Sequence, residues 1–223
     1  MDWIQKYQLF LFDFDGLLVD TERLHYSAYM ELARLRGCPL DWDFERFCLE
    51  AHSKSMGFFE GLQREYPNVF NEGPSQKELY EEKKRLYISL LRSTRLELME
   101  GVLPLINALH RLNVRCAVVT NSPKAQIDLI KAALPDLHKI PLWITREDYT
   151  APKPSPEGYL QAIALLGRPG DRIVGFEDSI KGLKALLAAG VEAFLVGPVV
   201  GPERVSEALA LGAKHVLTLA HLA

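Results

Sequence analysis

The sequence of 223 residues has little of several features that mark specialised classes of protein. Its 26 basic and 29 acidic side chains leave a formal net charge of −3, so it lacks the basic excess typical of a dedicated nucleic-acid binder. Apolar residues make up 48% of the chain, which excludes a disordered protein. We therefore expect a globular protein with no nucleic-acid partner.

Cysteine is also scarce. Cys38, Cys48 and Cys116 form no Cys-x-x-Cys or Cys/His cluster, which suits buried thiols in a reducing compartment better than a disulfide framework. No apolar run approaches the ~20 residues of a spanning helix, and no signal peptide is visible at the N-terminus. These absences predict a soluble, cytoplasmic protein with no membrane partner. Nothing indicates the oligomeric state, and a monomer is the default expectation.

Short apolar runs alternate with longer helical patterns along most of the chain. This alternation is typical of a parallel sheet covered by helices, and runs that are apolar throughout indicate strands buried on both faces. The candidate strands are 9–12, 114–119, 141–144, 172–176, 193–196 and a weak one near 215–217, and the candidate helices are 103–112, 124–134, 156–166 and 180–189.

One stretch breaks the alternation. Between residues 21 and 94 only helical periodicity and charge-rich segments occur. Because the first candidate strand precedes this stretch and the others follow it, we expect a helical domain inserted into an α/β core. The predicted fold is a doubly wound parallel sheet, a Rossmann-like core of residues 1–20 and 95–223, with a helical domain at 21–94.

Polar side chains stand at the ends of four predicted strands. The carboxyl ends of parallel strands form one edge of a sheet, where ligands bind. Carboxylates, a hydroxyl and an ammonium therefore meet at this edge. They belong to Asp13 and Asp15 after the first strand, Thr120 after the second, Lys153 after the third, and Glu177 and Asp178 after the fourth.

Each of these residue types has a role in phosphoryl transfer. Converging carboxylates repel one another unless a cation joins them, and all-oxygen ligands suit Mg²⁺. An aspartate such as Asp13 can form an aspartyl phosphate, and Asp15 can act as general acid and then as general base. Lys153 and the Thr120 hydroxyl would hold phosphate oxygens, and the backbone at Gly16 would allow close approach.

These segments resemble the four motifs of the haloacid dehalogenase superfamily in order and spacing. The helical insert after the first motif resembles the subgroup that contains β-phosphoglucomutase and small-metabolite phosphatases, and the resemblance covers nearly the whole chain. The matching segments are Phe12-Asp13-Phe14-Asp15-Gly16, Thr120-Asn121-Ser122, Lys153-Pro154 and Glu177-Asp178-Ser179.

The resemblance implies a Mg²⁺-dependent phosphatase that acts on a small phosphorylated metabolite, with the helical insert as a mobile cap. It implies Asp13 as nucleophile and metal ligand, and Asp15 as acid and base with its carbonyl on the metal. The other implied roles are phosphate binding by Thr120, Lys153 and Asn121, and completion of the metal site by Glu177 and Asp178, with direct contact between Glu177 and the metal left open.

The inserted domain carries weaker signals. His25 stands where mutase-like members carry a histidine that links cap closure to acid–base work, but packing in a helix explains it equally well. Lys83 or Lys84 would reach substrate, although residues 81–85 are more simply a solvated helix face. Mutases carry a cap arginine for the distal phosphate. Residues 47–63 contain none and offer only Lys54 and His52 as replacements. Lysine gives a point charge without a bidentate fork, which favours hydrolysis.

Two alternatives stay open. A β-phosphoglucomutase-like sugar phosphomutase would share every core residue, but a substrate hydroxyl would take the phosphoryl group in place of water. A phospho-accepting signalling or binding domain would also combine acidic residues, a hydroxyl and a lysine on a parallel sheet, without turnover. Receiver domains of that kind lack a helical insert after the first strand. The sequence does not name the substrate.

Overall fold

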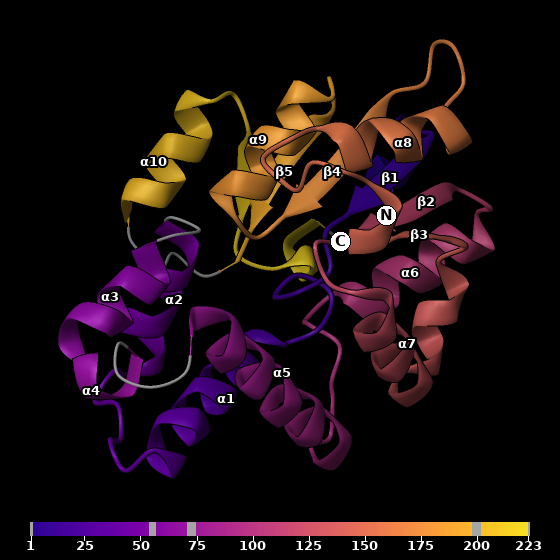
Figure 1. Cartoon of the computed structure of the whole chain (residues 1–223). Helices are drawn as coiled ribbons and strands as arrows, with labels where there is room; N and C mark the ends of the chain where they lie inside the picture. Colours follow the sequence, from indigo (N-terminus) through magenta and orange to yellow (C-terminus); the bar gives the residue numbers. More distant parts are fainter. Residues whose placement is uncertain (1, 54–56, 71–74, 198–201, 223) are drawn as a thin grey trace. The chain divides into compact units, whose positions relative to one another are not determined.

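The computed structural model describes residues 2–53, 57–70, 75–197 and 202–222 (Figure 1). It divides into two compact units, one of residues 1–20 with 96–223 and one of residues 21–95. The first, called the sheet unit here, contains all the strands of the described chain. The second, called the helical unit, contains five α-helices and no strand among its described residues.

The sheet unit is built on six parallel strands in the order β3-β2-β1-β4-β5-β6. This order is that of a doubly wound α/β fold, and it confirms the predicted fold class. The strand order reverses at β1, which lies between β2 and β4. The strands are β1 (Leu9–Phe12), β2 (Arg115–Val119), β3 (Leu142–Ile144), β4 (Ile173–Glu177), β5 (Glu192–Val196) and β6 (Lys214–Val216).

Helices cover both faces of this sheet. Figure 1 shows α6 and α7 on the side opposite α8 and α9, as right-handed crossovers on either side of β1 require. Predicted strand and helix bounds in this unit differ from the observed ones by no more than one residue. α10 was not among the predicted helices, and Ala208 is its one buried residue among those described. The helices are α6 (Val102–Arg111), α7 (Lys124–Ala133), α8 (Glu157–Leu166), α9 (Ile180–Ala188) and α10 (Pro202–Ala210).

β1 is held at the centre of the sheet because its four residues are all apolar and buried. Leu9 and Leu11 belong to a core shared with α8 and α9. On the other face, Phe12 stacks on Phe176 of β4, with ring centroids 5.4 Å apart. The residues that follow β1 therefore leave the sheet from a rigid base.

The helical unit has its own apolar core, which includes Leu32, Trp42 and Leu62. Ser75 begins its longest helix with a capping box, in which the Ser75 and Glu78 side chains each accept from the other's backbone N–H. No helix among the described residues is long and apolar enough to cross a membrane. The helices are α1 (Glu22–Leu35), α2 (Phe44–Ser53), α3 (Gly57–Glu65), α4 (Pro67–Phe70) and α5 (Gln76–Ser93).

Candidate active site

Asp13 and Asp15 lie on the loop that leaves β1. The Asp13 N–H extends the ladder by donating to the Phe176 carbonyl at 2.9 Å, which fixes Asp13 at the strand end. Gly16 has a φ of +75°, in the left-handed region that favours glycine. Its N–H donates to the Val19 carbonyl at 3.0 Å, so this amide already has a partner within the turn.

Lys153 joins Asp13 to the end of β4. Its ammonium donates to Asp13 Oδ1 at 2.5 Å, to Glu177 Oε1 at 2.7 Å and to the Val119 carbonyl at 2.8 Å. An ammonium has three hydrogens, so these three acceptors satisfy it. Burial lowers the pKa of Lys153, but the neighbouring Asp13 and Glu177 carboxylates more than reverse this effect and raise the pKa above its ordinary value.

Glu177 is fully buried and hydrogen-bonded at both carboxylate oxygens. Oε1 accepts from the Tyr159 hydroxyl at 2.6 Å as well as from Lys153, and Oε2 accepts from the Ser179 hydroxyl at 3.3 Å. Burial, together with the charge of Asp13, raises the pKa of Glu177 despite Lys153. The hydrogen bond from Lys153 to Glu177 fixes the position of the Lys153 ammonium beside Asp13.

The carboxylate cluster at the strand ends fits a hard cation. One oxygen from each of Asp13, Glu177 and Asp178 lies within 4.8 Å of the others. Such oxygen donors suit Mg²⁺. Glu177 already accepts hydrogen bonds from Lys153, Tyr159 and Ser179. The carboxylates of Asp13 and Asp178 are therefore the best suited of the three to bind a metal directly.

The Asp15 carboxylate faces the loop between β2 and α7. Asp15 Oδ2 accepts from the Thr120 hydroxyl at 3.2 Å and from the Ser122 hydroxyl at 2.5 Å. Asp15 Oδ1 lies 3.3 Å from the side-chain nitrogen of Gln126. The Thr120 hydroxyl also accepts from the Ser122 N–H at 2.9 Å, so the loop and Asp15 hold one another.

Asn121 braces the loops that carry Thr120 and Lys153. Its Oδ1 lies 2.7 Å from the Tyr149 hydroxyl and accepts from the Lys153 N–H at 3.3 Å. The same Tyr149 hydroxyl lies 2.7 Å from the Thr120 carbonyl. Asn121 thus joins the loops that follow two strands, and phosphate binding by Asn121 stays a prediction.

The sheet unit brings all the predicted core residues to one edge, and it adds four that the sequence analysis gave no role. Tyr159 holds Glu177, Tyr149 holds Asn121, and Ser122 and Gln126 bind Asp15. Ser122 could have been found because it belongs to the second motif. Tyr149, Tyr159 and Gln126 gave no signal, since their sequence surroundings are typical of ordinary helix and loop segments.

In the helical unit, His25 of α1 and Lys83 of α5 contact each other. Lys83 Nζ lies 2.6 Å from His25 Nδ1, and the His25 ring stacks on Tyr87 with centroids 4.2 Å apart. Lys83 is only 6% exposed, so the interpretation of residues 81–85 as a solvated face is wrong at this position. Lys54 lies outside the described residues.

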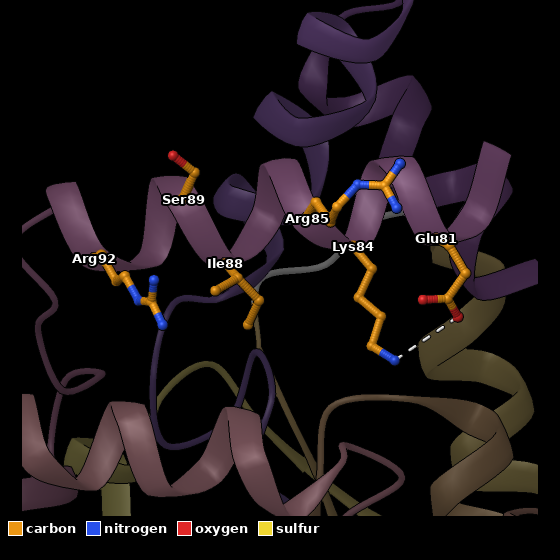
Figure 2. Close-up of a pocket in the computed structure, with 6 residues that line it drawn as sticks. All are labelled: Glu81, Lys84, Arg85, Ile88, Ser89 and Arg92. Atoms are coloured by element: carbon orange, nitrogen blue, oxygen red, sulfur yellow. Dashed lines mark ion pairs between the residues drawn. The ribbon is translucent and has the colours of Figure 1, made fainter. Parts of the chain in front are cut away.

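One face of α5 lines a cavity of about 440 Å³ (Figure 2). All of its lining side chains except Ile88 are exposed, so the cavity is open to solvent. Lys84 Nζ lies 3.8 Å from Glu81 Oε1, while Arg85 and Arg92 make no hydrogen bond or ion pair within the described part of the chain. Figure 2 shows Lys84 and Arg92 pointing to the same side of the helix, so positive charge exceeds negative charge on this face.

We expect His25 to stay neutral between pH 5 and pH 8. Burial, reinforced by the charge of Lys83, lowers the pKa of His25 from 6.5 to about 3, and an ammonium can only donate, so Nδ1 accepts. Below pH 6.5 the imidazole of His25 takes up a proton in the unfolded chain but stays neutral in the folded chain. The free energy of unfolding therefore decreases as the pH falls from 6.5 towards 3.

The measurement is an NMR titration of the imidazole resonances. The His25 signal, assigned with a His25→Gln variant, should stay flat from pH 8 to pH 5 in the folded protein. In the chain unfolded by urea it should titrate near ~6.5, the value of an exposed histidine. A folded-state midpoint above 5 would contradict the tautomer and the contact with Lys83.

The chain matches known proteins along most of its length. Residues 7–190 match the family model for haloacid dehalogenase-like hydrolases. The chain is 29% identical over 191 residues to the phosphorylated carbohydrates phosphatase of Thermotoga maritima, covering 82% of this chain and 81% of that protein. It is 28% identical over 204 residues to the β-phosphoglucomutase of Bacillus subtilis, covering 87% of each.

A solved structure extends this similarity to the fold. The crystal structure of CbbY from Rhodobacter sphaeroides in complex with phosphate superposes with a TM-score of 0.75 at 25% sequence identity. The superposition covers 97% of this chain and 96% of that one. The similarity therefore spans both the strands and the inserted helices.

Proposed function

Because the chain belongs to the family of haloacid dehalogenase-like hydrolases, we propose that it is a Mg²⁺-dependent phosphatase of small phosphorylated metabolites, such as sugar phosphates. Membership of this family confirms the resemblance and the prediction of an enzyme. The observation that carries the proposal is the buried contact between Asp13 and Lys153, which pairs a carboxylate nucleophile with a cation for phosphate.

In the first proposed step, an Asp13 oxygen attacks the phosphorus of the substrate. The bond between phosphorus and the ester oxygen breaks, and the leaving oxygen takes a proton from Asp15. Lys153 and the Thr120 hydroxyl give up their present carboxylate acceptors, Asp13 and Asp15, to hold the phosphoryl oxygens, where negative charge gathers in the transition state. The products of this step are an alcohol and an aspartyl phosphate on Asp13.

In the second proposed step, water hydrolyses the aspartyl phosphate. The water oxygen forms a bond to phosphorus, a proton passes from the water to Asp15, and the bond between phosphorus and the Asp13 oxygen breaks. Phosphate leaves, and both aspartates return to their first state. The proximity of the Asp15 carboxylate to Thr120, a phosphate-binding residue in this proposal, supports its action at the phosphoryl group.

The residues that would hold Mg²⁺ are Asp13 and Asp178 through their carboxylates and Asp15 through its carbonyl. When bound, Mg²⁺ supplies positive charge that allows a carboxylate and a phosphate to meet. Glu177 contributes by holding Lys153 in place, and Asn121 by bracing the two loops. Gly16 provides the turn that lets the phosphate approach the backbone.

The helical unit would serve as the cap that selects the leaving group and excludes water. The contact between His25 and Lys83 supports a role for this pair in shaping the cap. Lys54 stays a proposed substrate contact. The positive charge of the α5 cavity supports a substrate that carries negative charge.

The second candidate is an intramolecular sugar phosphomutase. It is favoured by the similarity to the β-phosphoglucomutase of Bacillus subtilis and by Arg85 and Arg92, which offer guanidinium groups for a second phosphate. Isomerised sugar phosphate, formed only with a bisphosphate primer, would support it. The hydrolase family does not support the third interpretation, a phospho-accepting signalling domain.

Removal of divalent metal is expected to abolish phosphate release. We would measure release from a panel of sugar phosphates, nucleotides and an aryl phosphate, with Mg²⁺ and with EDTA. Activity should fall about a hundredfold or more in EDTA, because two anions must then meet without the cation, and added Mg²⁺ should restore it. No release from any compound, with Mg²⁺ binding confirmed by calorimetry, would refute the phosphatase proposal.

A further inference from the structure

Gln126 is a buried polar side chain beside the proposed acid and base. It lies in the first turn of α7 and is only 8% exposed, and its buried neighbours on that helix, Ile127 and Ile130, are apolar. A buried amide is costly unless its polar atoms are hydrogen-bonded. The hydrogen-bond partners of the Gln126 amide therefore explain why a polar side chain is buried at this position.

The amide nitrogen of Gln126 faces Asp15 and Ser122. It lies 3.3 Å from Asp15 Oδ1 and 3.1 Å from the Ser122 hydroxyl oxygen, and its two hydrogens can serve both. The Ser122 hydroxyl in turn donates to Asp15 Oδ2 at 2.5 Å. Each oxygen of the Asp15 carboxylate thus accepts from a donor on the first turn of α7 or on the loop before it.

We propose that Gln126 is a positioning residue that sets the direction of the Asp15 carboxylate for the hydrolysis of the aspartyl phosphate. This role rests on the proposed function. In the first step the leaving oxygen belongs to a bound substrate, which orients Asp15 as it takes the proton. Water has no such attachment, so in the second step the orientation of Asp15 depends on the protein's own donors.

The test compares the two steps in a Gln126→Met variant. Methionine has a similar length and is apolar, but it has no donor. We expect the rate constant for hydrolysis of the phosphoenzyme to fall about tenfold, with formation of the phosphoenzyme within about threefold of wild type and KM nearly unchanged. Ser122→Ala, which removes another donor to Asp15, should act non-additively with Gln126→Met, because both side chains bind one carboxylate.

The measurement is stopped-flow release of nitrophenolate from p-nitrophenyl phosphate, with rapid-quench detection of the phosphoenzyme. The burst reports formation of the phosphoenzyme, and the following steady rate reports its hydrolysis. Gln161→Met is the matched control, because Gln161 lies partly buried on α8 and its side chain makes no hydrogen bond within the described residues. Both rate constants should be unchanged in it.

Three results would overturn the inference. Equal losses in both steps, with a lower melting temperature, would show a structural role. Unchanged rate constants would show that the hydrogen bond from Gln126 does not affect the reaction. Faster hydrolysis would show that this bond holds the Asp15 carboxylate in an unproductive orientation. Each of these leaves the phosphatase intact, whereas a wild-type enzyme that forms no phosphoenzyme refutes the proposed function and this role with it.

Discussion

Asp13→Asn is expected to lower turnover by about a thousandfold or more. Asparagine keeps the shape of the side chain, and Lys153 keeps its bonds to Glu177 and to the Val119 carbonyl, so the fold should persist. What is lost is the carboxylate oxygen that attacks phosphorus. A neutral amide is also a weaker ligand for Mg²⁺.

The measurement has two parts. Steady-state phosphate release gives the loss in rate, and acid quench after incubation with a ³²P-labelled ester gives the covalent intermediate. The label should remain on the wild-type chain and be absent from Asp13→Asn, whose intact mass excludes reversion to aspartate. Asp128→Asn, at an exposed site on α7, is the control and should keep full activity. A labelled Asp13→Asn chain would show that another residue is the nucleophile.

The sheet was predictable because its strands are buried on both faces. Runs such as Leu9–Phe12 are apolar throughout and end abruptly at charged or polar residues, so their bounds can be located to within one residue. α10 (Pro202–Ala210) was not predictable in the same way. Its burial is slight, with Ala208 as its one fully buried hydrophobic residue among those described, so its pattern is weak.

Some residues of the candidate site could be predicted from the sequence, and others could not. Residues at strand ends, such as Asp13 and Lys153, were predictable because topology alone brings them together. Lys83 was not, since a lysine within a charged run is ordinarily solvated, and its partner His25 lies 58 positions away in the chain. Tyr159 likewise acquires its role only when α8 packs on the sheet and presents its hydroxyl to Glu177 at the end of β4.

Lys153→Met is expected to abolish turnover and to destabilise the sheet unit. Methionine fills similar space but leaves the buried carboxylates of Asp13 and Glu177 facing each other without the ammonium between them. Removing one partner of a buried ion pair costs about 3–5 kcal/mol. Because Glu177 can take up a proton, we expect the free energy of unfolding to fall by about 3 kcal/mol in urea titrations with EDTA present.

The matched control is Lys184→Met in α9. Lys184 pairs with Glu207 at 2.7 Å, but both side chains are 46% exposed. Water screens such a pair, so its loss should change the free energy of unfolding by less than about 1 kcal/mol. Turnover should stay at the wild-type level. A similar loss in both variants would show that the buried ion pairs of Lys153 contribute no more to the free energy of unfolding than an exposed pair does.

A double variant, Lys153→Met with Glu177→Gln, separates the structural role of Lys153 from its chemical role. The neutral amide removes the uncompensated charge, so most of the lost stability should return. Turnover should not return, because the phosphoryl oxygens still lack their ammonium. Recovery of turnover together with stability would instead show that Lys153 serves only to neutralise the two carboxylates. Stable but inactive protein would place the ammonium of Lys153 among the groups that act on the phosphoryl oxygens.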